Sequence, residues 1–357
     1  MANDTLAGNL RLGAIPRQQV SHTALVNAVE GTLADFLTPQ IAMLDAIDPS
    51  LGGFARTARD LVMAGGKRLR PTFAYWGWRG VAGAGGNAEA VLPALGALEL
   101  MHTFALVHDD LMDDSATRRG RPTAHRIFGA RHGERFGSSA AVLIGDLCLV
   151  WADQLLARTP LPAATLLEVR ARYDRMRIEA VAGQYLDVLG ETDPASWSVD
   201  RALVVARHKT ASYTVQWPLD FGLALAGTDD PEVAEAYRVY GTTVGEAFQL
   251  RDDLLGVYGD PAVTGKPAGD DLRTGKPTTL LMLARRMATP AQLGELDTAG
   301  IGRKAEIVAE TGAPARVEEM IRARVAEGLT ALADAPIETE ARSVLVELAT
   351  VATQRPA

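Results

Sequence analysis

The sequence has little cysteine, no leader-like start and no long uninterrupted apolar run. Cys148 is the single cysteine among 357 residues, which excludes an intramolecular disulfide and a zinc site built from cysteines alone. The first residues, MANDTLAGNL, carry an early aspartate and no apolar core, unlike a secretory signal. The best membrane-span candidate, 91–107, is interrupted by Glu99 and His102 and falls short of about 18 uninterrupted apolar residues. We therefore expect a cytoplasmic protein without a transmembrane segment.

Positive charge is also in short supply. The chain has 36 lysines and arginines against 44 acidic residues, a net charge of −8, which argues against a bulk basic surface for nucleic acid. Hydrophobic residues make up 47% and charged residues 22%, as is usual for a globular protein. This composition excludes a disordered or collagen-like chain.

Apolar residues recur at helical spacing along most of the sequence. In 22–37 they form one stripe, with Ser21 as a candidate N-cap. Similar patterns recur near 56–64, 88–107, 139–157, 163–189, 201–226, 231–258, 277–287 and 315–353, and no run resembles a strand ladder. We expect residues 1–20 to form a mobile arm and 21–357 a single all-helical domain. The polar, Gly/Pro-rich stretch 259–277 reads as a loop, and a loop of that length is usually functional or disordered.

The first of two acidic clusters is Asp109, Asp110, Asp113 and Asp114, which follows the apolar segment LMHTFAL. Asp109 and Asp113 are four residues apart and share one face of a helix. Two carboxylates about 4 Å apart repel by about 4 kcal/mol at an effective dielectric constant of 20. No lysine or arginine lies within one turn of either residue. The pattern indicates either a bound cation or a fully solvated helix end.

The second acidic cluster is the pair Asp252 and Asp253, which continues another apolar helical stripe. Gln249 projects to nearly the same face as Asp252. The pair could also be an ordinary surface feature neutralised by Arg251. Two such clusters, each in a helix otherwise suited to a core, favour Mg²⁺, which prefers oxygen ligands and is commonly shared with substrate phosphates.

Basic residues accompany these aspartates. The segment GGKRLRP supplies Lys67, Arg68 and Arg70, and RRGRPT follows the first acidic cluster. Further candidates stand later in the chain: Lys209, Lys266 and Lys276. Arginine forks pair with phosphate oxygens in a bidentate way, and lysine acts as a point charge. The combination indicates a substrate whose phosphates are held partly through metal.

Six segments in this order resemble the trans-isoprenyl diphosphate synthases, and within them most closely the geranylgeranyl diphosphate synthases. They are GGKRLRP, HDDLMDDSATRRGRPTAH, GDLCL, GQYLDV, KTASYT and FQLRDDLLGVYGDPAVTGKPAGDDLRTGKPT, spanning roughly 65–285. The resemblance implies an all-α bundle around a deep central cavity, a homodimer, and three Mg²⁺ ions when substrate is bound.

The resemblance also implies residue roles. The metal ligands would be Asp109, Asp110, Asp113, Asp252 and Asp253. The isopentenyl diphosphate head would be held by Lys67, Arg70, His102 and Arg119. The allylic diphosphate would be held by Arg118, Lys209, Thr210, Gln249, Lys266 and Lys276. The residues expected to act in catalysis are Asp109, Asp113, Asp252, Lys209 and Arg118. Further family motifs contain Asp146, Gln184 and Asp187 without a specific role.

One position departs from the family pattern. The second aspartate motif usually ends in an aspartate at its fifth position, and here that position is Gly256. One acidic contribution to the metal cluster is therefore missing. Asp260 or the pair Asp270–Asp271 are candidates to compensate for it.

Product length should depend on the residues one turn before the first aspartates. Ala105 lies four residues before Asp109 on the same face, and Phe104 flanks it. A small side chain at 105 lets an isoprenoid tail pass, and a ring at 104 can form a floor, a pattern that resembles enzymes stopping at C20. The alternative is that Phe104 is an ordinary core residue.

We therefore expect head-to-tail condensation of isopentenyl diphosphate with C5, C10 or C15 allylic diphosphates, giving mainly geranylgeranyl diphosphate. A synthase of another length, C15 or C25 and longer, is one alternative. A class I terpene cyclase is another, but it would have no isopentenyl head for Lys67, Arg70 and His102 to hold. A non-catalytic partner subunit is the third, although such a subunit could lose aspartates that this chain retains.

Overall fold

The computed structural model describes residues 21–192, 196–260 and 269–353. These residues are almost entirely helical, which confirms the predicted all-α class. They fall into two compact units, the first made of 21–72, 84–113 and 124–166 and the second of 73–83, 114–123 and the described residues from 167 on. The predicted arm 1–20 lies outside the described residues, and the single domain over 21–357 stays a prediction.

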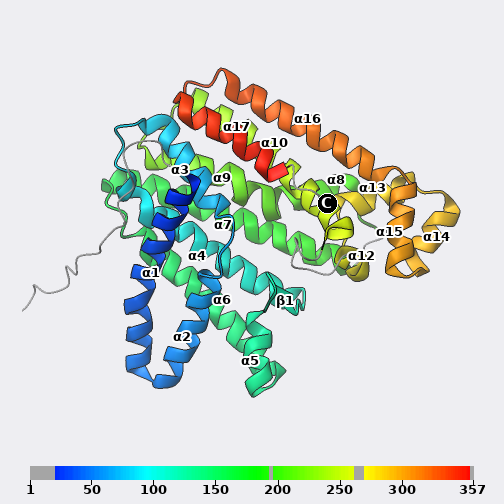
Figure 1. Cartoon of the computed structure of the whole chain (residues 1–357), viewed down its shortest axis with the longest axis horizontal. Helices are drawn as coiled ribbons and strands as arrows, with labels where there is room; N and C mark the ends of the chain where they lie inside the picture. Colours follow the sequence, from blue (N-terminus) through cyan, green and yellow to red (C-terminus); the bar gives the residue numbers. More distant parts are fainter. Residues whose placement is uncertain (1–20, 193–195, 261–268, 354–357) are drawn as a thin grey trace, which may run out of the picture. The chain divides into compact units, whose positions relative to one another are not determined.

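The first unit is organised around two long helices that pack on each other, α4 (Ala88–Met112) and α6 (Glu134–Leu156). A helical hairpin, α1 (His22–Ile47) and α2 (Pro49–Val62), packs on α4, and α5 (Ala124–His132) packs on α6 (Figure 1). The predicted N-cap is confirmed, because the Ser21 side chain accepts a hydrogen bond from the backbone N–H of Ala24. Asp48 and Asn87 cap α2 and α4 in the same way.

Both α4 and α6 are long and apolar enough, by composition, to cross a membrane. In α4, 78% of the most apolar window is buried inside the protein, which is typical of a core helix. The buried Glu99 that interrupts this run pairs with Arg68, whose Nη1 lies 2.6 Å from Glu99 Oε2. The corresponding window of α6 is only half-buried, so α6 presents an apolar face outside the packing of its own chain.

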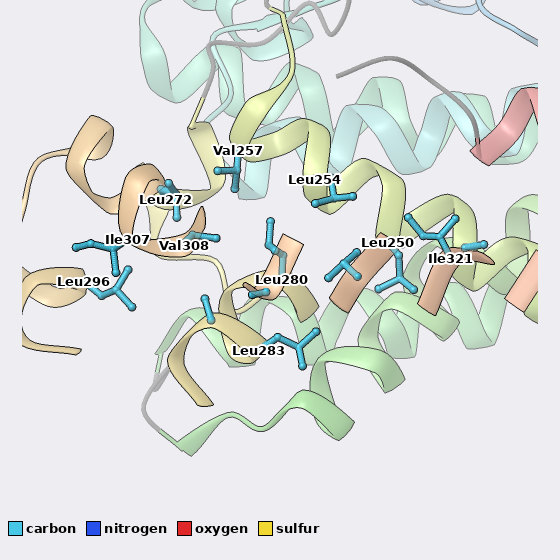
Figure 2. Close-up of a cluster of buried hydrophobic side chains, with 14 residues drawn as sticks. Leu250, Leu254, Val257, Leu272, Leu280, Leu283, Leu296, Ile307, Val308 and Ile321 are labelled. Carbon is cyan, nitrogen blue, oxygen red and sulfur yellow. The ribbon is translucent and has the colours of Figure 1, made fainter. Parts of the chain in front are cut away.

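The second unit is organised around α10 (Pro231–Tyr258). Around it lie α8 (Val199–Val205), the π-helix η2 (Ala206–Gln216), α9 (Trp217–Leu225), α12 (Asp270–Thr274), α13 (Thr279–Met287), α14 (Pro290–Thr298), α15 (Ile301–Glu310), α16 (Ala313–Ala333) and α17 (Thr339–Thr353). Most of α3 (Leu69–Ala82) and of α7 (Ala163–Thr192) also belongs here. In Figure 2, Leu250, Leu254 and Val257 of α10 join a buried cluster with leucines and isoleucines of α12, α13, α15 and α16. This cluster anchors the half of α10 that carries the second acidic motif.

A two-residue hairpin joins β1 (Thr117–Arg118) to the antiparallel β2 (Arg121–Pro122). Both linking residues are left-handed, with φ 53° at Arg119 and 71° at Gly120. Two such residues match the backbone twist of paired strands, which is why this turn forms a tight hairpin. These strands were not predicted from the sequence, because two residues in each strand are too few to show an alternating pattern.

Several helices differ from the sequence pattern. Nearly every residue of α3 is buried, so it shows no amphipathic stripe and was not predicted. The helices α5, α14 and α15 were also missed. The segment 315–353 is two helices separated by 334–338, and α12 lies inside the predicted loop 259–277 between two left-handed glycines, Gly269 and Gly275. A single turn bounded by glycines carries too little periodicity to be recognised.

Candidate active site

The predicted site residues divide between the two units. The first unit holds Lys67, Arg70, His102, Phe104, Ala105, Asp109, Asp110 and Asp113. The second holds Arg118, Arg119, Lys209, Thr210, Gln249, Asp252, Asp253 and Lys276. Lys266 lies outside the described residues.

The first acidic motif lies at the C-terminal end of α4. Asp113 is the C-cap residue, and its backbone N–H donates to the carbonyl of Asp109 at 2.8 Å. Asp110 is buried, and Asp109 and Asp113 are half-buried. The last turn of α4 contains no basic residue. Because a helix C-terminus carries partial negative charge, a cation is electrostatically favoured beside these three carboxylates.

Arg68 has a structural role that corrects part of the anion-binding prediction for GGKRLRP. Its guanidinium donates to Glu99, to Glu30 and to the carbonyl of Val62, and its side chain is buried. The Arg68 backbone is left-handed, with φ 46°. Because the guanidinium is buried and engaged by these acceptors, Arg68 is not available to a phosphate. Lys67 is exposed, and Arg70 is buried in the first turn of α3.

The second acidic motif combines a buried carboxylate with a half-buried one. Asp253 is buried and accepts hydrogen bonds from Gln249 Nε2 at 2.9 Å and from the backbone N–H of Thr279 at 3.0 Å. Burial is the largest cause that raises its pKa to about 7, and the charges of Asp271 and Asp252 add to the shift. Asp252 is half-buried beside it.

Arg251 is not the ion-pair partner of these aspartates. Its Nη1 and Nη2 donate to the two carboxylate oxygens of Glu318 at 2.6 and 2.8 Å, and its Nε donates to the carbonyl of Thr353. All three guanidinium nitrogens are therefore engaged by α16 and α17. The alternative in which Arg251 neutralises the aspartate pair is wrong.

The structure places Asp271 against the glycine that departs from the family pattern. An ideal Cβ built on Gly256 would lie 2.0 Å from Asp271 Oδ2, so the carboxylate occupies the space that a side chain at 256 would need. The backbone N–H of Gly269 donates to the carbonyl of Gly256 at 3.1 Å, which holds the start of α12 against α10. Of the candidates for compensation, Asp271 lies beside Gly256 and Asp260 is exposed, while the side chain of Asp270 lies outside the described part of the structure.

The donors in this part of the second unit suit a magnesium ion. Asp252, Asp253 and Asp271 are hard oxygen donors whose charges act on one another, as the raised pKa of Asp253 records. The last turn of α10, like that of α4, has no basic residue. A divalent cation would offset the repulsion among these carboxylates.

Two lysines predicted to bind the allylic diphosphate meet at one carboxylate. Asp187 of α7 is buried and forms ion pairs with the ammonium groups of Lys209, on η2, and Lys276, which follows α12; the Lys276 Nζ–Oδ2 distance is 2.7 Å. The lysines are far apart in sequence, and Asp187 holds both charges in one place. Asp187 was predicted without a specific role, because only the tertiary structure reveals its two partners.

A glycine of α7 sets the position of Lys209. A Cβ on Gly183 would lie 2.2 Å from the backbone nitrogen of Lys209, so α7 and η2 touch through their backbones. Lys209 and Thr210 lie within the π-helical stretch 206–216. Such widened turns are rare and often mark functional sites.

The predicted chain-length residues, Phe104 and Ala105, are half-buried on α4. The Phe104 ring meets the His108 ring edge-on, with 4.8 Å between centroids and 68° between planes. Phe104 is less enclosed than residues 91–101 of α4, which are all buried.

Residues 53–311 match the polyprenyl synthetase family. A geranylfarnesyl diphosphate synthase of Aeropyrum pernix is 32% identical over 296 residues, 80% of this chain and 89% of that one. An octaprenyl diphosphate synthase of Escherichia coli (strain K12) is 34% identical over 334 residues, 91% and 97% of the two chains.

Among solved structures, a geranylgeranyl pyrophosphate synthase of Corynebacterium glutamicum, complexed with isoprenyl diphosphate and magnesium, is similar with a TM-score of 0.90. It is 39% identical, and the alignment covers 94% of this chain and all of that one. The family predicted from the sequence motifs is confirmed. The chain belongs to the polyprenyl synthetase family, the prenyltransferases that make trans-prenyl diphosphates.

Proposed function

We propose that this protein condenses isopentenyl diphosphate with C5 to C15 allylic diphosphates, with Mg²⁺, and that its main product is geranylgeranyl diphosphate. The observation that carries the proposal is the convergence of Lys209 and Lys276 on Asp187, in the unit that also holds the acidic end of α10. The last turn of α10 contains no basic residue. Clustered ammonium groups and carboxylates of this kind suit a diphosphate held directly by lysines and through metal.

The chemistry needs no covalent nucleophile. Bound Mg²⁺ would stabilise the negative charge of the leaving diphosphate. Lys209 and Lys276 would donate to the diphosphate oxygens as the allylic C–O bond breaks, with Arg118 adding positive charge. The double bond of isopentenyl diphosphate then attacks the allylic carbon, a C–C bond forms, and the departing diphosphate takes the released proton. Lys67, Arg70, His102 and Arg119 would orient the isopentenyl head.

Asp271 would supply the carboxylate that Gly256 lacks. Its oxygen already occupies the space beside α10 in which a side chain at 256 would stand. We infer that Asp271 contributes to metal binding together with Asp252, while Asp253, whose oxygens accept from Gln249 and Thr279, supports the cluster from the interior. Asp109, Asp110 and Asp113 would bind metal from the first unit.

The C20 assignment rests on Phe104 as the floor of the product cavity. Phe104 is half-buried with Ala105 beside it, which suits a ring that meets a substrate tail. Phe104→Ala is expected to lengthen the product, measured by chromatography of the dephosphorylated alcohols. An unchanged product distribution would make Phe104 an ordinary core residue and reopen C15 or C25 and longer products.

A second copy of this chain is the partner we propose. On α6, Phe136, Leu143 and Val150 are exposed at seven-residue spacing. On α7, Ile178, Val181, Tyr185 and Val188 are exposed at alternating spacings of three and four residues. These are the spacings of helices that pack lengthwise on other helices, so each face suits a homodimer.

The first experiment incubates purified protein with Mg²⁺, labelled isopentenyl diphosphate and each allylic diphosphate, and measures product length. A C20 product that requires both substrates is expected. Asp109→Ala, with helical content unchanged, should abolish turnover; substantial remaining activity in excess Mg²⁺ would reject its metal role. Hydrocarbon from an allylic diphosphate alone would favour a cyclase, and no turnover would favour a partner subunit.

A further inference from the structure

The imidazole of His108 is held between two helices of the first unit. Its Nε2 lies 3.1 Å from the carbonyl oxygen of Val142 on α6. The Phe104 ring, one turn earlier on α4, meets the imidazole edge-on, with 4.8 Å between the ring centroids. His108 therefore ties Phe104 to a carbonyl on the neighbouring helix.

A glycine on α6 makes this arrangement sterically allowed. An ideal Cβ built on Gly145 would lie 2.1 Å from His108 Nε2 and 2.3 Å from Cδ2. At these distances the imidazole and a Cβ at 145 cannot occupy the same place, so the ring would have to turn away from α6. Gly145 thus forms a notch in α6 that accepts the imidazole, and any larger residue there would displace the ring.

We propose that His108 is a positioning residue for product length, which holds the Phe104 ring in place through the notch at Gly145. The inference rests on the proposed function, in which Phe104 ends the product cavity. It assigns to His108 a specificity role that is separate from the metal and diphosphate contacts of the neighbouring aspartates.

The imidazole of His108 limits the freedom of the Phe104 side chain. A half-buried phenylalanine on a helix has more than one accessible side-chain rotamer, and a neighbouring ring in edge-on contact favours one of them. The hydrogen bond to Val142 fixes the imidazole, so the contact with Phe104 has a defined geometry. Without the imidazole, Phe104 can turn aside and let a longer tail pass.

The test compares His108→Ala with His132→Ala, measuring the ratio of products longer than C20 to C20 at equal conversion. His132 is a matched control, because its ring meets Phe136 edge-on at the same 4.8 Å centroid distance, 61° between planes, in the same unit. We expect the ratio to rise about fivefold in His108→Ala, the factor expected from a ring contact of this kind, and to stay unchanged in His132→Ala. An unchanged ratio in His108→Ala overturns the proposal.

Two further variants separate the ring contact from other effects. His108→Gln keeps a nitrogen that can donate to Val142 but lacks the ring, so it should lengthen products as alanine does; a wild-type ratio would overturn the proposal. In a Phe104→Ala background, His108→Ala should add no further lengthening, because its effect acts through Phe104. An additive effect would overturn the positioning role.

If His108→Ala loses all activity, Gly145→Ala tests the proposal instead. The added Cβ displaces the His108 ring from α6 and leaves the sequence of α4 unchanged. It should raise the same product ratio, and an active variant with an unchanged ratio overturns the proposal. Measurements on the wild-type protein separate failure of the proposed function from failure of this inference. No condensation by the wild type overturns the proposed function together with this inference, whereas condensation with a product ratio that no variant moves overturns this inference alone.

Discussion

Asp271 places its carboxylate in the space beside Gly256, where a Cβ would lie 2.0 Å from Oδ2. The two residues lie on different helices, α12 and α10, and the Gly269–Gly256 backbone hydrogen bond holds the helices together at this point. Glycine at 256 therefore leaves the room that the Asp271 carboxylate occupies. Its presence is not only the loss of an acidic residue.

Removing this carboxylate should weaken metal binding. Asp271→Ala is expected to raise the Mg²⁺ concentration for half-maximal activity by about tenfold or more, as for other residues that support a metal site. In the double variant Gly256→Asp/Asp271→Ala, the carboxylate moves to α10 and part of the Mg²⁺ affinity should return. Activity and calorimetry of Mg²⁺ binding measure both effects.

Asp260→Asn is the control for that exchange, since Asp260 is exposed just after α10. It should leave the Mg²⁺ dependence unchanged. A large effect at 260 combined with none at 271 would show that the compensating carboxylate had been wrongly assigned.

The buried carboxyl of Asp253 should make stability depend on pH when metal is removed. Its pKa is about 7 in the folded state and near 3.8 in the unfolded chain, so between pH 4 and 7 the folded state holds the extra proton. The unfolding free energy should therefore fall as pH rises through this range, by at most about 4 kcal/mol, and level off above pH 7. Urea titrations in EDTA measure this slope.

Asp253→Asn should flatten that slope. The oxygen of the asparagine amide can still accept from the Thr279 N–H. The Gln249 amide can turn over, so that its oxygen accepts from the NH₂ group of the new asparagine. A variant whose stability falls with pH as steeply as the wild type's would assign the dependence to another group.

Gly183→Ala should disturb both stability and substrate binding, because its Cβ would lie 2.2 Å from Lys209 N. We expect a loss of about 1–3 kcal/mol in unfolding free energy and a raised KM for the allylic diphosphate. Gly294→Ala is the control: it lies in α14 with no atom near its Cβ, and should stabilise by about 0.5–1 kcal/mol. Equal behaviour of the two variants would contradict the close approach.

Charge on the exposed face of α7 should prevent self-association. Ile178→Glu with Val181→Glu places two carboxylates on side chains that are 69% and 57% exposed, so folding of one chain should be little affected. Light scattering should show a dimer for the wild type and a monomer for the variant. Val351→Glu, at an exposed valine of α17, should remain dimeric. A wild-type monomer would reject the homodimer.

Sequence periodicity recovered most long helices, because apolar residues recur along them at helical spacing, and Ser21 marks the start of α1. It failed for α3, which is buried on all faces, and for the single turn of α12. From the basic segment GGKRLRP, Arg68 was predicted to be one of several cations near an anion. The sequence cannot reveal that Glu99 and Glu30 pair with Arg68 in the folded protein.

The sequence by itself determined the helical class, the family and the residue types of the site, because ordered motifs and 3.6-residue periodicity are local properties. Only the tertiary structure decided which groups meet: Lys209 and Lys276 at Asp187, Asp271 at Gly256, and His108 between Phe104 and Gly145. These contacts join distant segments at close range. Their geometry depends on how whole helices pack, which no local pattern encodes.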